Sequence, residues 1–366
     1  MKILYDHDIF YIQKVGGVSK YFLEIFSIIK KFHNVKIVAP IYINEYLKNY
    51  KSKNIFKLLK IKKKYKYTNR FFRFLNIIIF KFFLNIYKPN IIHLTYFNKK
   101  LEFKKNCKIV ITVYDLIHEI FQKKYFFKYP SNFKKEYISN ADHIICISQN
   151  TKKDLLNFYN VDKKKISVIP LGFNRSKKFI KINDSFLNNS YLLFVGERKK
   201  YKNFINLIVA YSNSKKLMSN YKIVCFGGGP LDSLEKKLLK KYNINLLNVK
   251  CISGSNEELN YAYMKAKAYI CTSLYEGFGM TILEAMNMNC PIISSNAGSL
   301  KEVGGDAVEY FDPNNPQDIK SKIEKIVYSK KNINSQIKKY HANLEKFSWE
   351  LTAKKTLSVY EKLYNK

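Results

Sequence analysis

One short segment in the C-terminal half of the chain constrains its fold more than any other. Residues 268–273, AYICTS, are apolar enough for a buried strand, and residues 280–286, MTILEAM, have the apolar spacing of a helix. Between them lie Gly277 and Gly279, and glycines let a backbone approach a ligand closely. The segment therefore predicts an α/β fold in which a strand leads through a glycine turn into a helix.

Two carboxylates, Glu276 and Glu284, flank this turn. The first amides of a helix have no partners within the helix and suit an anion such as phosphate, which a carboxylate would repel. A carboxylate instead accepts hydrogen bonds from hydroxyl groups. A ligand that carries both phosphate and hydroxyls, such as a nucleotide-sugar, satisfies both requirements. The alternative is an ordinary strand, turn and helix with a glutamate favoured by the helix dipole.

The segment around Glu276 and Glu284 resembles the paired-glutamate signature of retaining glycosyltransferases of family 4, which adopt the GT-B fold. Residues 295–307, SNAGSLKEVGGDA, and residues 311–313, FDP, are similar to the closing segments of the same family. The resemblance implies an α/β protein with two doubly wound, Rossmann-like domains that face each other across a cleft. It also implies a C-terminal helix that crosses back to the first domain.

The resemblance also implies a role for individual residues. Glu276 is expected near the hydroxyls of the donor sugar and Glu284 near the ribose. The backbone of the glycine turn is expected to cradle the sugar and the diphosphate, the loop at Gly254 to contact the base, and a second glycine loop in the first domain to face the diphosphate. The donor-binding residues implied in this way are Gly16, Gly17, Gly254, Gly277, Phe278, Gly279, Met280 and Glu284.

Two cations follow the predicted strand 191–195, namely Arg198 and Lys202. A diphosphate leaving group gains negative charge as the sugar departs, and fixed cations stabilise that charge most in the transition state. Arginine can bind two phosphate oxygens at once, and lysine adds a point charge. The segment is similar to the one that holds the phosphate-gripping Arg and Lys of the family, so Arg198 and Lys202 are catalytic candidates. The alternative is that they are two surface cations in a very basic chain.

The first half of the chain supplies a further catalytic candidate, Asp115. Residues 112–119, TVYDLIHE, lie where many family members have a His-Asp pair, and here Tyr114 replaces the histidine while Asp115 matches. We expect Asp115 to contact the acceptor or the sugar. Whether His118 takes the place of the missing histidine is left open.

Asp6 and Asp8 form an acidic pair of the kind that binds a metal in sugar transferases of the other major fold. Here the pair follows the first strand of a doubly wound sheet, and the cations at 198 and 202 already supply the charge that a metal would. We therefore expect neither a metal nor another cofactor. The stretch around Gly16 resembles mannosyltransferases of bacterial surface polysaccharide assembly, which favours GDP-mannose over a UDP-sugar as the donor.

The chain of 366 residues is long enough for two domains. Strand-like and helix-like patterns alternate up to about Gly172, lapse in a polar stretch, and then restart at Tyr191. This pattern predicts a first domain at 1–180 that binds the acceptor, a second at 181–345 that binds the donor, and a C-terminal helix at 346–366. Six scattered cysteines without a Cys-x-x-Cys pair, and no secretory signal before residue 1, predict reduced thiols in a cytoplasmic protein.

The net charge of +37 is concentrated in one region, since residues 46–101 contain 15 Lys and Arg and no carboxylate. Residues 71–84 within it are strongly apolar but include Arg73 and Lys81, so they make a poor membrane-spanning helix. A helix in the surface of an anionic bilayer fits better, which predicts membrane contact at 48–88 and a location at the inner face of the cell membrane. The alternative is a core helix in a chain of biased composition.

Together these features predict a retaining, metal-independent glycosyltransferase that moves a hexose, with mannose favoured, from a nucleotide-sugar to a lipid-linked or polysaccharide acceptor in bacterial surface glycan synthesis. The front-face mechanism of the family implies that the leaving phosphate helps to take the acceptor proton. Two alternatives remain: a nucleotide-sugar epimerase on the same fold, and a polyanion-binding protein without catalysis. No sequence-specific nucleic-acid motif is present, so no specific nucleic-acid partner is expected.

Overall fold

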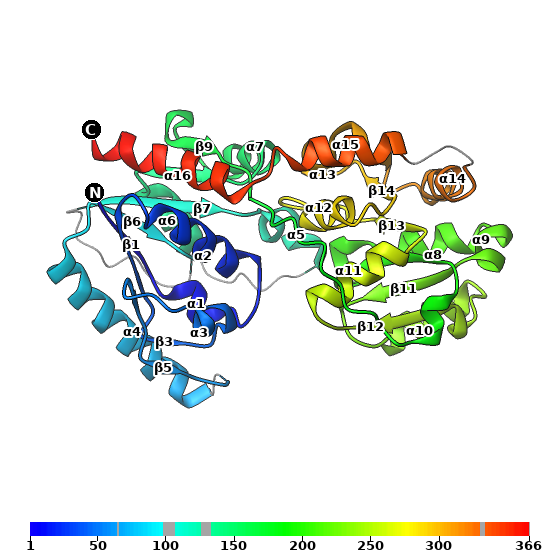
Figure 1. The fold of residues 1–366 in the computed structure, drawn as a ribbon, viewed down its shortest axis with the longest axis horizontal. Coiled ribbons are helices and arrows are strands. Elements are labelled where there is room, and N and C mark those ends of the chain that lie inside the picture. The colour runs from blue at the N-terminus through cyan, green and yellow to red at the C-terminus, as the bar shows by residue number, and fades with distance from the viewer. Residues whose placement is uncertain (64–65, 98–106, 126–132, 330–333, 366) are drawn as a thin grey trace. The chain divides into compact units, whose positions relative to one another are not determined.

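The computed structural model describes residues 1–63, 66–97, 107–125, 133–329 and 334–365. The chain forms two compact units (Figure 1). Unit 1 comprises Met1–Glu119, Phe127–Gly172 and Phe347–Lys366. Unit 2 comprises Ile120–Phe126 and Phe173–Lys346. In each unit strands alternate with helices along the chain, as the sequence pattern predicted.

Unit 1 is built on a seven-stranded parallel sheet in the order β4-β2-β1-β6-β7-β8-β9. Residues in its central strands, such as Leu4 and Ile92, are fully buried, because helices cover both faces of such a sheet. Its strands are β1 (Lys2–Tyr5), β2 (Asn34–Val38), β4 (Ile55–Phe56), β6 (Ile91–Leu94), β7 (Lys108–Val113), β8 (His143–Cys146) and β9 (Ile166–Val168). The short strands β3 (Ile41–Tyr42) and β5 (Leu59–Lys60) form a separate parallel pair.

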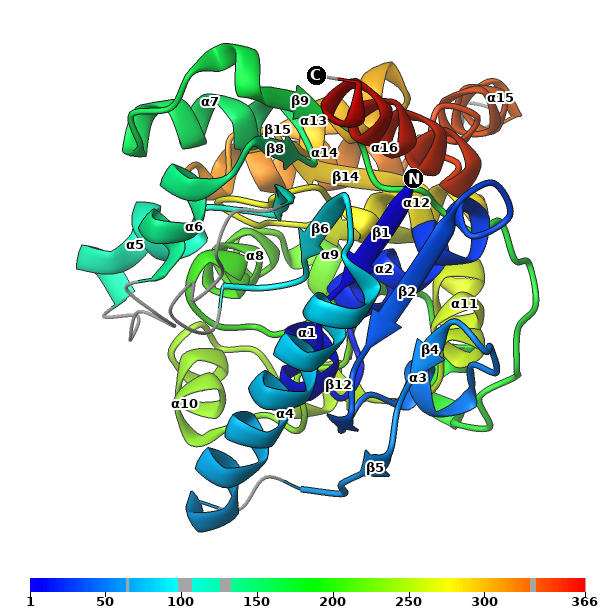
Figure 2. The same cartoon turned by 90° about the vertical axis from the view of Figure 1, so that its left-hand side faces the viewer.

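The helices of unit 1 include a long one, α4, that is seen along its whole length in Figure 2. They are α1 (Asp8–Ile12), α2 (Gly17–Ile29), α3 (Glu45–Asn49), α4 (Lys66–Tyr87), α6 (Phe133–Asn140), α7 (Gln149–Phe158) and α16 (Trp349–Tyr364). Helix α5 (Ile117–Tyr125) contains the boundary between the units, which falls after Glu119.

Unit 2 is built on a six-stranded parallel sheet in the order β12-β11-β10-β13-β14-β15. Its strands are β10 (Tyr191–Val195), β11 (Lys222–Phe226), β12 (Val249–Ile252), β13 (Ala268–Cys271), β14 (Ile292–Ser295) and β15 (Glu309–Phe311). Its helices are α8 (Phe204–Ser212), α9 (Lys215–Asn220), α10 (Ser233–Lys241), α11 (Asn256–Lys265), α12 (Met280–Asn287), α13 (Leu300–Gly304), α14 (Pro316–Val327) and α15 (Asn334–Leu344).

The boundary between the units lies at Gly172, earlier than the predicted position at 180. Residues 173–180 belong to unit 2 because they bind helix α11. The Asn260 amide donates to the Lys178 carbonyl at 2.7 Å, and the Ile180 amide donates to the Glu257 carbonyl at 3.1 Å. This polar stretch is thus held in place by backbone and side-chain hydrogen bonds.

The C-terminal helix α16 returns to unit 1 and packs on α2, as the sequence predicted. Ser348 caps its first turn by accepting a hydrogen bond from the Leu351 amide at 3.1 Å. Near its other end, the Tyr360 hydroxyl lies 2.5 Å from Nδ1 of His93 in β6. Nε2 of His93 lies 2.8 Å from the Thr112 hydroxyl in β7, so one buried imidazole links the last helix to two central strands.

We expect a lower pH to reduce the contribution of His93 to the free energy of unfolding. Burial lowers the pKa of His93 to about 3, whereas the unfolded chain has the ordinary value near 6.5. Between these values only the unfolded state binds the proton, so His93 contributes stability above pH 6.5 that is lost as the pH falls toward 3. The contribution should fall by about 2 kcal/mol between pH 6.5 and pH 5.

Urea unfolding of the wild type and of His93→Gln at both pH values measures this effect. The variant should be the less stable protein at pH 6.5, and the difference in unfolding free energy should shrink at pH 5. Tyr360→Phe serves as the control, because it removes one hydrogen bond but keeps the buried imidazole. A difference between wild type and His93→Gln that does not change with pH contradicts the expectation.

Candidate active site

The parallel order of unit 2 gathers several predicted residues at one edge of its sheet. Arg198 and Lys202 follow β10, Glu276 follows β13, and Gly298 follows β14. The carboxyl ends of neighbouring parallel strands meet at the same edge, which is where ligands bind in open α/β sheets. The loops that carry these residues therefore share one end of the unit.

Lys202 and Glu276 form the central ion pair of this edge. Nζ of Lys202 lies 2.6 Å from Oε1 of Glu276, and the Ser273 hydroxyl donates to the same oxygen at 2.6 Å. The two side chains are only 22% and 16% exposed. Burial works to lower the pKa of Lys202, but the adjacent Glu276 carboxylate outweighs it and the pKa is raised above its ordinary value. Lys202 is therefore a fixed cation at neutral pH.

The loop after β14 holds the backbone of Glu276 in place. Gly298 has a φ of +59°, and a Cβ there would lie 2.8 Å from the Glu276 carbonyl oxygen, so only glycine fits. The next residue, Ser299, donates from its amide and its hydroxyl to that carbonyl, at 3.2 and 2.8 Å. Its hydroxyl also lies 2.8 Å from the Phe278 carbonyl. The segment SNAGS thus fixes the glutamate loop, a role that sequence reasoning did not assign to it.

Helix α12 begins directly after this loop. Gly279 caps it with a φ of +106° and without a side-chain hydrogen bond, which presents the first-turn amides at the same edge of the sheet. Gly277 and Phe278 are buried in the turn, and Met280 is the first helical residue. This is the arrangement that the sequence predicted for binding of an anion.

Glu284 lies one turn further along α12 and is fixed by Tyr263 of α11, whose hydroxyl donates to Oε2 at 3.2 Å. Burial, and then the Glu284 carboxylate, raises the pKa of Tyr263, so this hydroxyl keeps its proton and remains a donor. Gly254 precedes α11, and its neighbour Ser255 caps that helix through a capping box with Glu258. The residues expected to contact the nucleoside thus lie on α12 and in the turn before α11, and the contacts themselves stay a prediction.

The guanidinium of Arg198 is held by other groups of the protein. Its side chain is 2% exposed, and Nε donates to Glu235 at 2.9 Å. The remaining guanidinium nitrogens donate to the backbone carbonyls of residues 227–230, at 3.0 to 3.4 Å. In this structure Arg198 therefore organises the glycine loop that follows β11, and a direct contact with phosphate stays a prediction.

Sequence reasoning missed Glu235, the partner of Arg198. It lies at the third position of α10 and forms a capping box with Asp232. The pattern Asp-x-x-Glu after a glycine-rich turn is visible in the sequence and predicts the start of a helix. It does not reveal that the same carboxylate binds a guanidinium 37 positions earlier in the chain.

The candidates of the first half of the chain lie in unit 1. Gly16 caps α2 and Gly17 is its first residue, and the Gln13 side chain folds beside them to accept from the Ser19 amide at 3.0 Å. Asp115 accepts from the Ile117 amide at 3.1 Å, and burial, offset in part by Lys134, raises its pKa. Contacts of Asp115 with a substrate stay a prediction, as does any role for His118.

The acidic residues near the N-terminus have partners within the protein. Asp6 is fully buried and accepts hydrogen bonds from the amide and the hydroxyl of Thr95, the first at 2.9 Å. Nε2 of His7 lies 3.5 Å from Oδ1 of Asp8. Within the described residues, no group of three or more His, Cys, Asp or Glu side chains is arranged to hold a metal ion.

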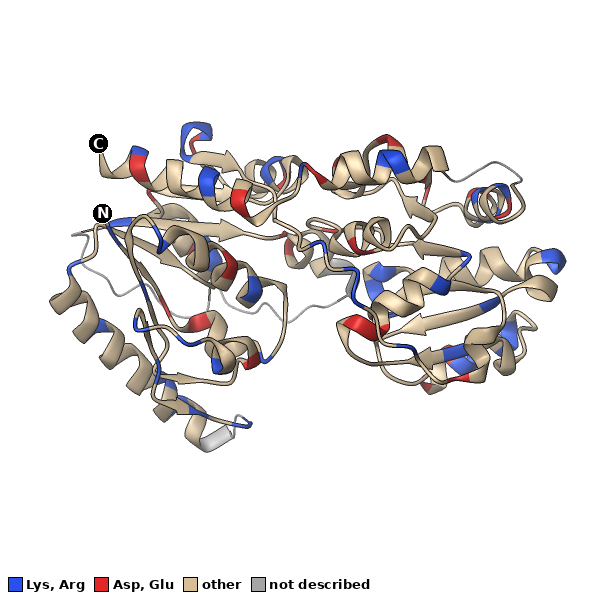
Figure 3. Cartoon of the chain, in the orientation of Figure 1, with Lys and Arg blue, Asp and Glu red and all other residues tan. Residues whose placement is uncertain are grey.

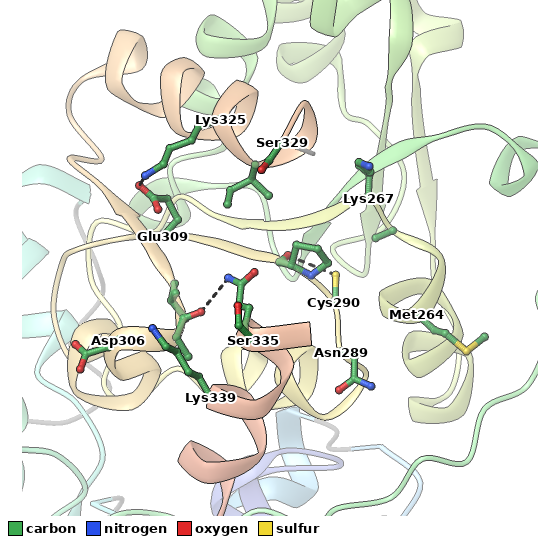
Figure 4. A pocket seen from close by; sticks show the side chains of 16 residues that line it. Met264, Lys267, Asn289, Cys290, Asp306, Glu309, Lys325, Ser329, Ser335 and Lys339 are labelled. Carbon is green, nitrogen blue, oxygen red and sulfur yellow. Dashed lines mark hydrogen bonds and ion pairs between the residues drawn. The ribbon is translucent and has the colours of Figure 1, made fainter. Parts of the chain in front are cut away.

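A cavity of about 730 Å³ lies at the other end of the unit 2 sheet (Figure 4). Its lining includes Lys267, Pro291 and Val308, which directly precede β13, β14 and β15. Lys325 at its rim lies 2.8 Å from Glu309. None of the predicted donor-binding residues lines this cavity, so it is distinct from the candidate site.

Two family models match the sequence of this chain. Residues 175–343 match the family model described as glycosyl transferases group 1, and residues 15–177 match the model of glycosyltransferase family 4. The chain thus contains a glycosyltransferase family 4 domain followed by a glycosyl transferases group 1 domain. The two matches meet close to the boundary between the units.

The chain is similar to enzymes of O-antigen assembly. It is 30% identical to the O-antigen chain mannosyltransferase RfbU of Salmonella typhimurium over 226 residues, which are 59% of this chain and 60% of that protein. It is 25% identical to O-antigen chain mannosyltransferase B of Escherichia coli over 252 residues, which are 64% and 65% of the two chains. The matches therefore span less than two thirds of these relatives.

Solved structures confirm the GT-B fold. A glycosyltransferase from Rickettsia africae aligns with a TM-score of 0.71 at 19% identity, over 99% of this chain and 98% of that one. The Anabaena protein Alr3699/HepE, solved with UDP and glucose, aligns with a TM-score of 0.69 at 14% identity, over 98% and 99% of the two chains. The prediction of two Rossmann-like α/β units is thereby confirmed.

We expect the Arg198–Glu235 pair to carry much of the stability of unit 2. Because both side chains are buried, Glu235→Ala leaves a buried guanidinium without its counter-charge, and the free energy of unfolding should fall by about 3 to 5 kcal/mol. Glu309→Ala is the matched control, since it removes a carboxylate whose lysine partners are partly exposed, and should cost about 1 kcal/mol or less.

Denaturant unfolding of the single variants and of Arg198→Met/Glu235→Ala measures the coupling. The double variant should lose less stability than the sum of the two single variants, because no unpaired charge remains buried. Strictly additive losses contradict the assignment of the pair.

Proposed function

We propose that this family 4 protein is a retaining, metal-independent hexosyltransferase of bacterial surface glycan synthesis. The observation that carries the proposal is the partly buried Lys202–Glu276 pair beside the glycine turn and the first amides of α12. A cation and a helix start suit the diphosphate of a nucleotide-sugar, while a carboxylate suits the sugar hydroxyls. Lys202 would stabilise the charge that develops on the leaving diphosphate.

The retaining course and the independence of metal follow from the family resemblance. In the front-face mechanism of the family, the leaving phosphate helps to take the proton of the acceptor. Lys202 already supplies a fixed positive charge, so the reaction as proposed needs no bound metal ion and no other cofactor. Glu276 then acts in two ways, by orienting the sugar and by keeping Lys202 charged and in position.

Mannose is the proposed sugar and GDP-mannose the proposed donor. The resemblance around Gly16 and the names of the related O-antigen mannosyltransferases support this choice. The acceptor is proposed to be a lipid-linked glycan, which places the protein at the cytoplasmic face of the cell membrane as a peripheral protein. Among the described residues, no helix combines the length and apolar character needed to cross a bilayer.

We expect Lys202→Met to lower kcat by about 10²- to 10³-fold, because it removes a cation that acts on the leaving diphosphate. Glu276→Gln should also lower turnover strongly, since it removes both the carboxylate and the partner of Lys202. Transfer of radiolabelled mannose from GDP-mannose to a lipid-linked acceptor, with and without EDTA, measures these effects. Lys199→Met, an exposed cation of the same loop, is the control and should be close to wild type.

The same purified protein can be used to distinguish the proposed transferase from the two alternatives, a nucleotide-sugar epimerase and a polyanion-binding protein. Conversion of the free nucleotide-sugar without an acceptor identifies an epimerase. Binding of nucleic acid that weakens with salt and ignores nucleotide-sugars identifies a polyanion-binding protein. A thermal-shift panel of nucleotide-sugars gives the donor independently of turnover, since a tight ligand stabilises the folded state by mass action. Stabilisation by no nucleotide-sugar would contradict the proposal.

A further inference from the structure

Helix α4 carries a row of large apolar side chains that face away from unit 1. Phe71, Phe74, Ile78, Phe82 and Ile86 are each between 47% and 64% exposed. At 3.6 residues per turn these five positions fall within about 120° of the helix circumference. We call this row the outer stripe. An apolar row of this length on an exposed helix is uncommon in a protein that has no partner for it.

The opposite side of α4 holds the helix to unit 1. Asn76 is fully buried and forms two hydrogen bonds with the backbone of Ile41, at 2.8 and 3.0 Å. Tyr87 donates to the Asn34 carbonyl at 2.5 Å, and Phe80 is fully buried between these contacts along the helix. The helix therefore cannot turn its outer stripe inward without breaking these bonds. Both sides of α4 are apolar, but only one is covered by the protein.

Basic residues accompany the outer stripe. Arg70 and Lys81 lie on the same flank of it, within about 40° of Phe74 by helical spacing. Figure 3 shows basic and no acidic positions along α4, and residues 46–101 contain no carboxylate at all. A second copy of the chain, docked symmetrically on this stripe, would bring the two basic flanks together with no acid on either helix to pair them. An anionic surface, in contrast, is complementary to the flank.

We propose that the outer stripe is the surface by which this protein lies on an anionic lipid bilayer. Phe71, Phe74, Ile78, Phe82 and Ile86 enter the boundary between headgroups and acyl chains, with α4 parallel to the membrane plane. Arg70 and Lys81 contact lipid phosphates beside the stripe. This inference rests on the peripheral location proposed above, and it is independent of the sugar, the donor and the transfer reaction.

Co-sedimentation with vesicles tests the inference with the full chain. The probes are phosphatidylcholine vesicles with and without half phosphatidylglycerol. The wild type should bind the anionic vesicles, and Ile78→Ser/Phe82→Ser should bind them at least tenfold more weakly. Leu234→Ser/Leu247→Ser removes two comparably exposed apolar side chains from unit 2 and should bind within twofold of the wild type. Equal loss in both variants overturns the proposal.

A fluorescent reporter shows whether the stripe itself enters the lipid. The chain has one tryptophan, Trp349, which is buried. In Ile78→Trp, the added emission should shift to the blue with anionic vesicles and be quenched by lipids brominated near the headgroup. Unchanged emission overturns the proposal. So does a dimer of the wild type, seen by light scattering without lipid, that dissociates in Ile78→Ser/Phe82→Ser, because that result assigns the stripe to a second copy.

The thermal-shift panel with nucleotide-sugars separates this inference from the proposed function. Ile78→Ser/Phe82→Ser should unfold cooperatively and retain the donor-induced shift of the wild type, because both positions lie in unit 1 and outside the candidate site. Loss of vesicle binding with an intact shift supports the inference. Normal vesicle binding in a protein that no nucleotide-sugar stabilises would overturn the proposed function but leave the inference standing.

Discussion

The ion pair between Lys202 and Glu276 is the interaction on which the candidate site depends. Each side chain is largely removed from water, so each needs a counter-charge at all times. In the structure the two groups satisfy each other at 2.6 Å. The proposed nucleotide-sugar would offer a replacement for both, because its diphosphate can pair with the lysine and its hydroxyls can donate to the carboxylate. On this proposal, the pair keeps two charged groups in position for a ligand that carries both kinds of partner.

The surrounding loops position this pair by backbone contacts rather than by further charges. Gly298 and Ser299 fix the main chain at Glu276, and Arg198 gathers the carbonyls of residues 227–230. Rigid loops at the carboxyl ends of a parallel sheet hold donors and acceptors in fixed directions, which is the main requirement for electrostatic catalysis. Arg198 contributes to this rigidity through Glu235, whatever else it contacts during turnover.

The sequence predicted the fold, and it predicted that the candidate residues of unit 2 follow the carboxyl ends of its strands, because alternating strands and helices and the glycines at strand ends determine both. It did not predict the partner of Arg198, since a long side chain reaches in many directions and Glu235 lies on a different loop. It also left α4 open between a core helix and a membrane-surface helix. Helical periodicity gives the angle between Phe80 and Phe82 around the helix axis, but it does not show which side chain faces the protein. In the structure Phe80 is buried and Phe82 is exposed.

The positive charge of the chain is concentrated in residues 46–101. A net charge of +37 causes repulsion between like charges in the compact state. Residues 46–101 contain no carboxylate, so ion pairs within this segment cannot reduce the repulsion. Glu45, which directly precedes this segment, binds Lys60 at 2.6 Å. Lys57, in the same segment, donates instead to the backbone carbonyls of Leu47, Lys48 and Tyr50. The anionic bilayer surface proposed above would supply negative groups in large number, so the basic composition of this segment is consistent with the proposed membrane contact.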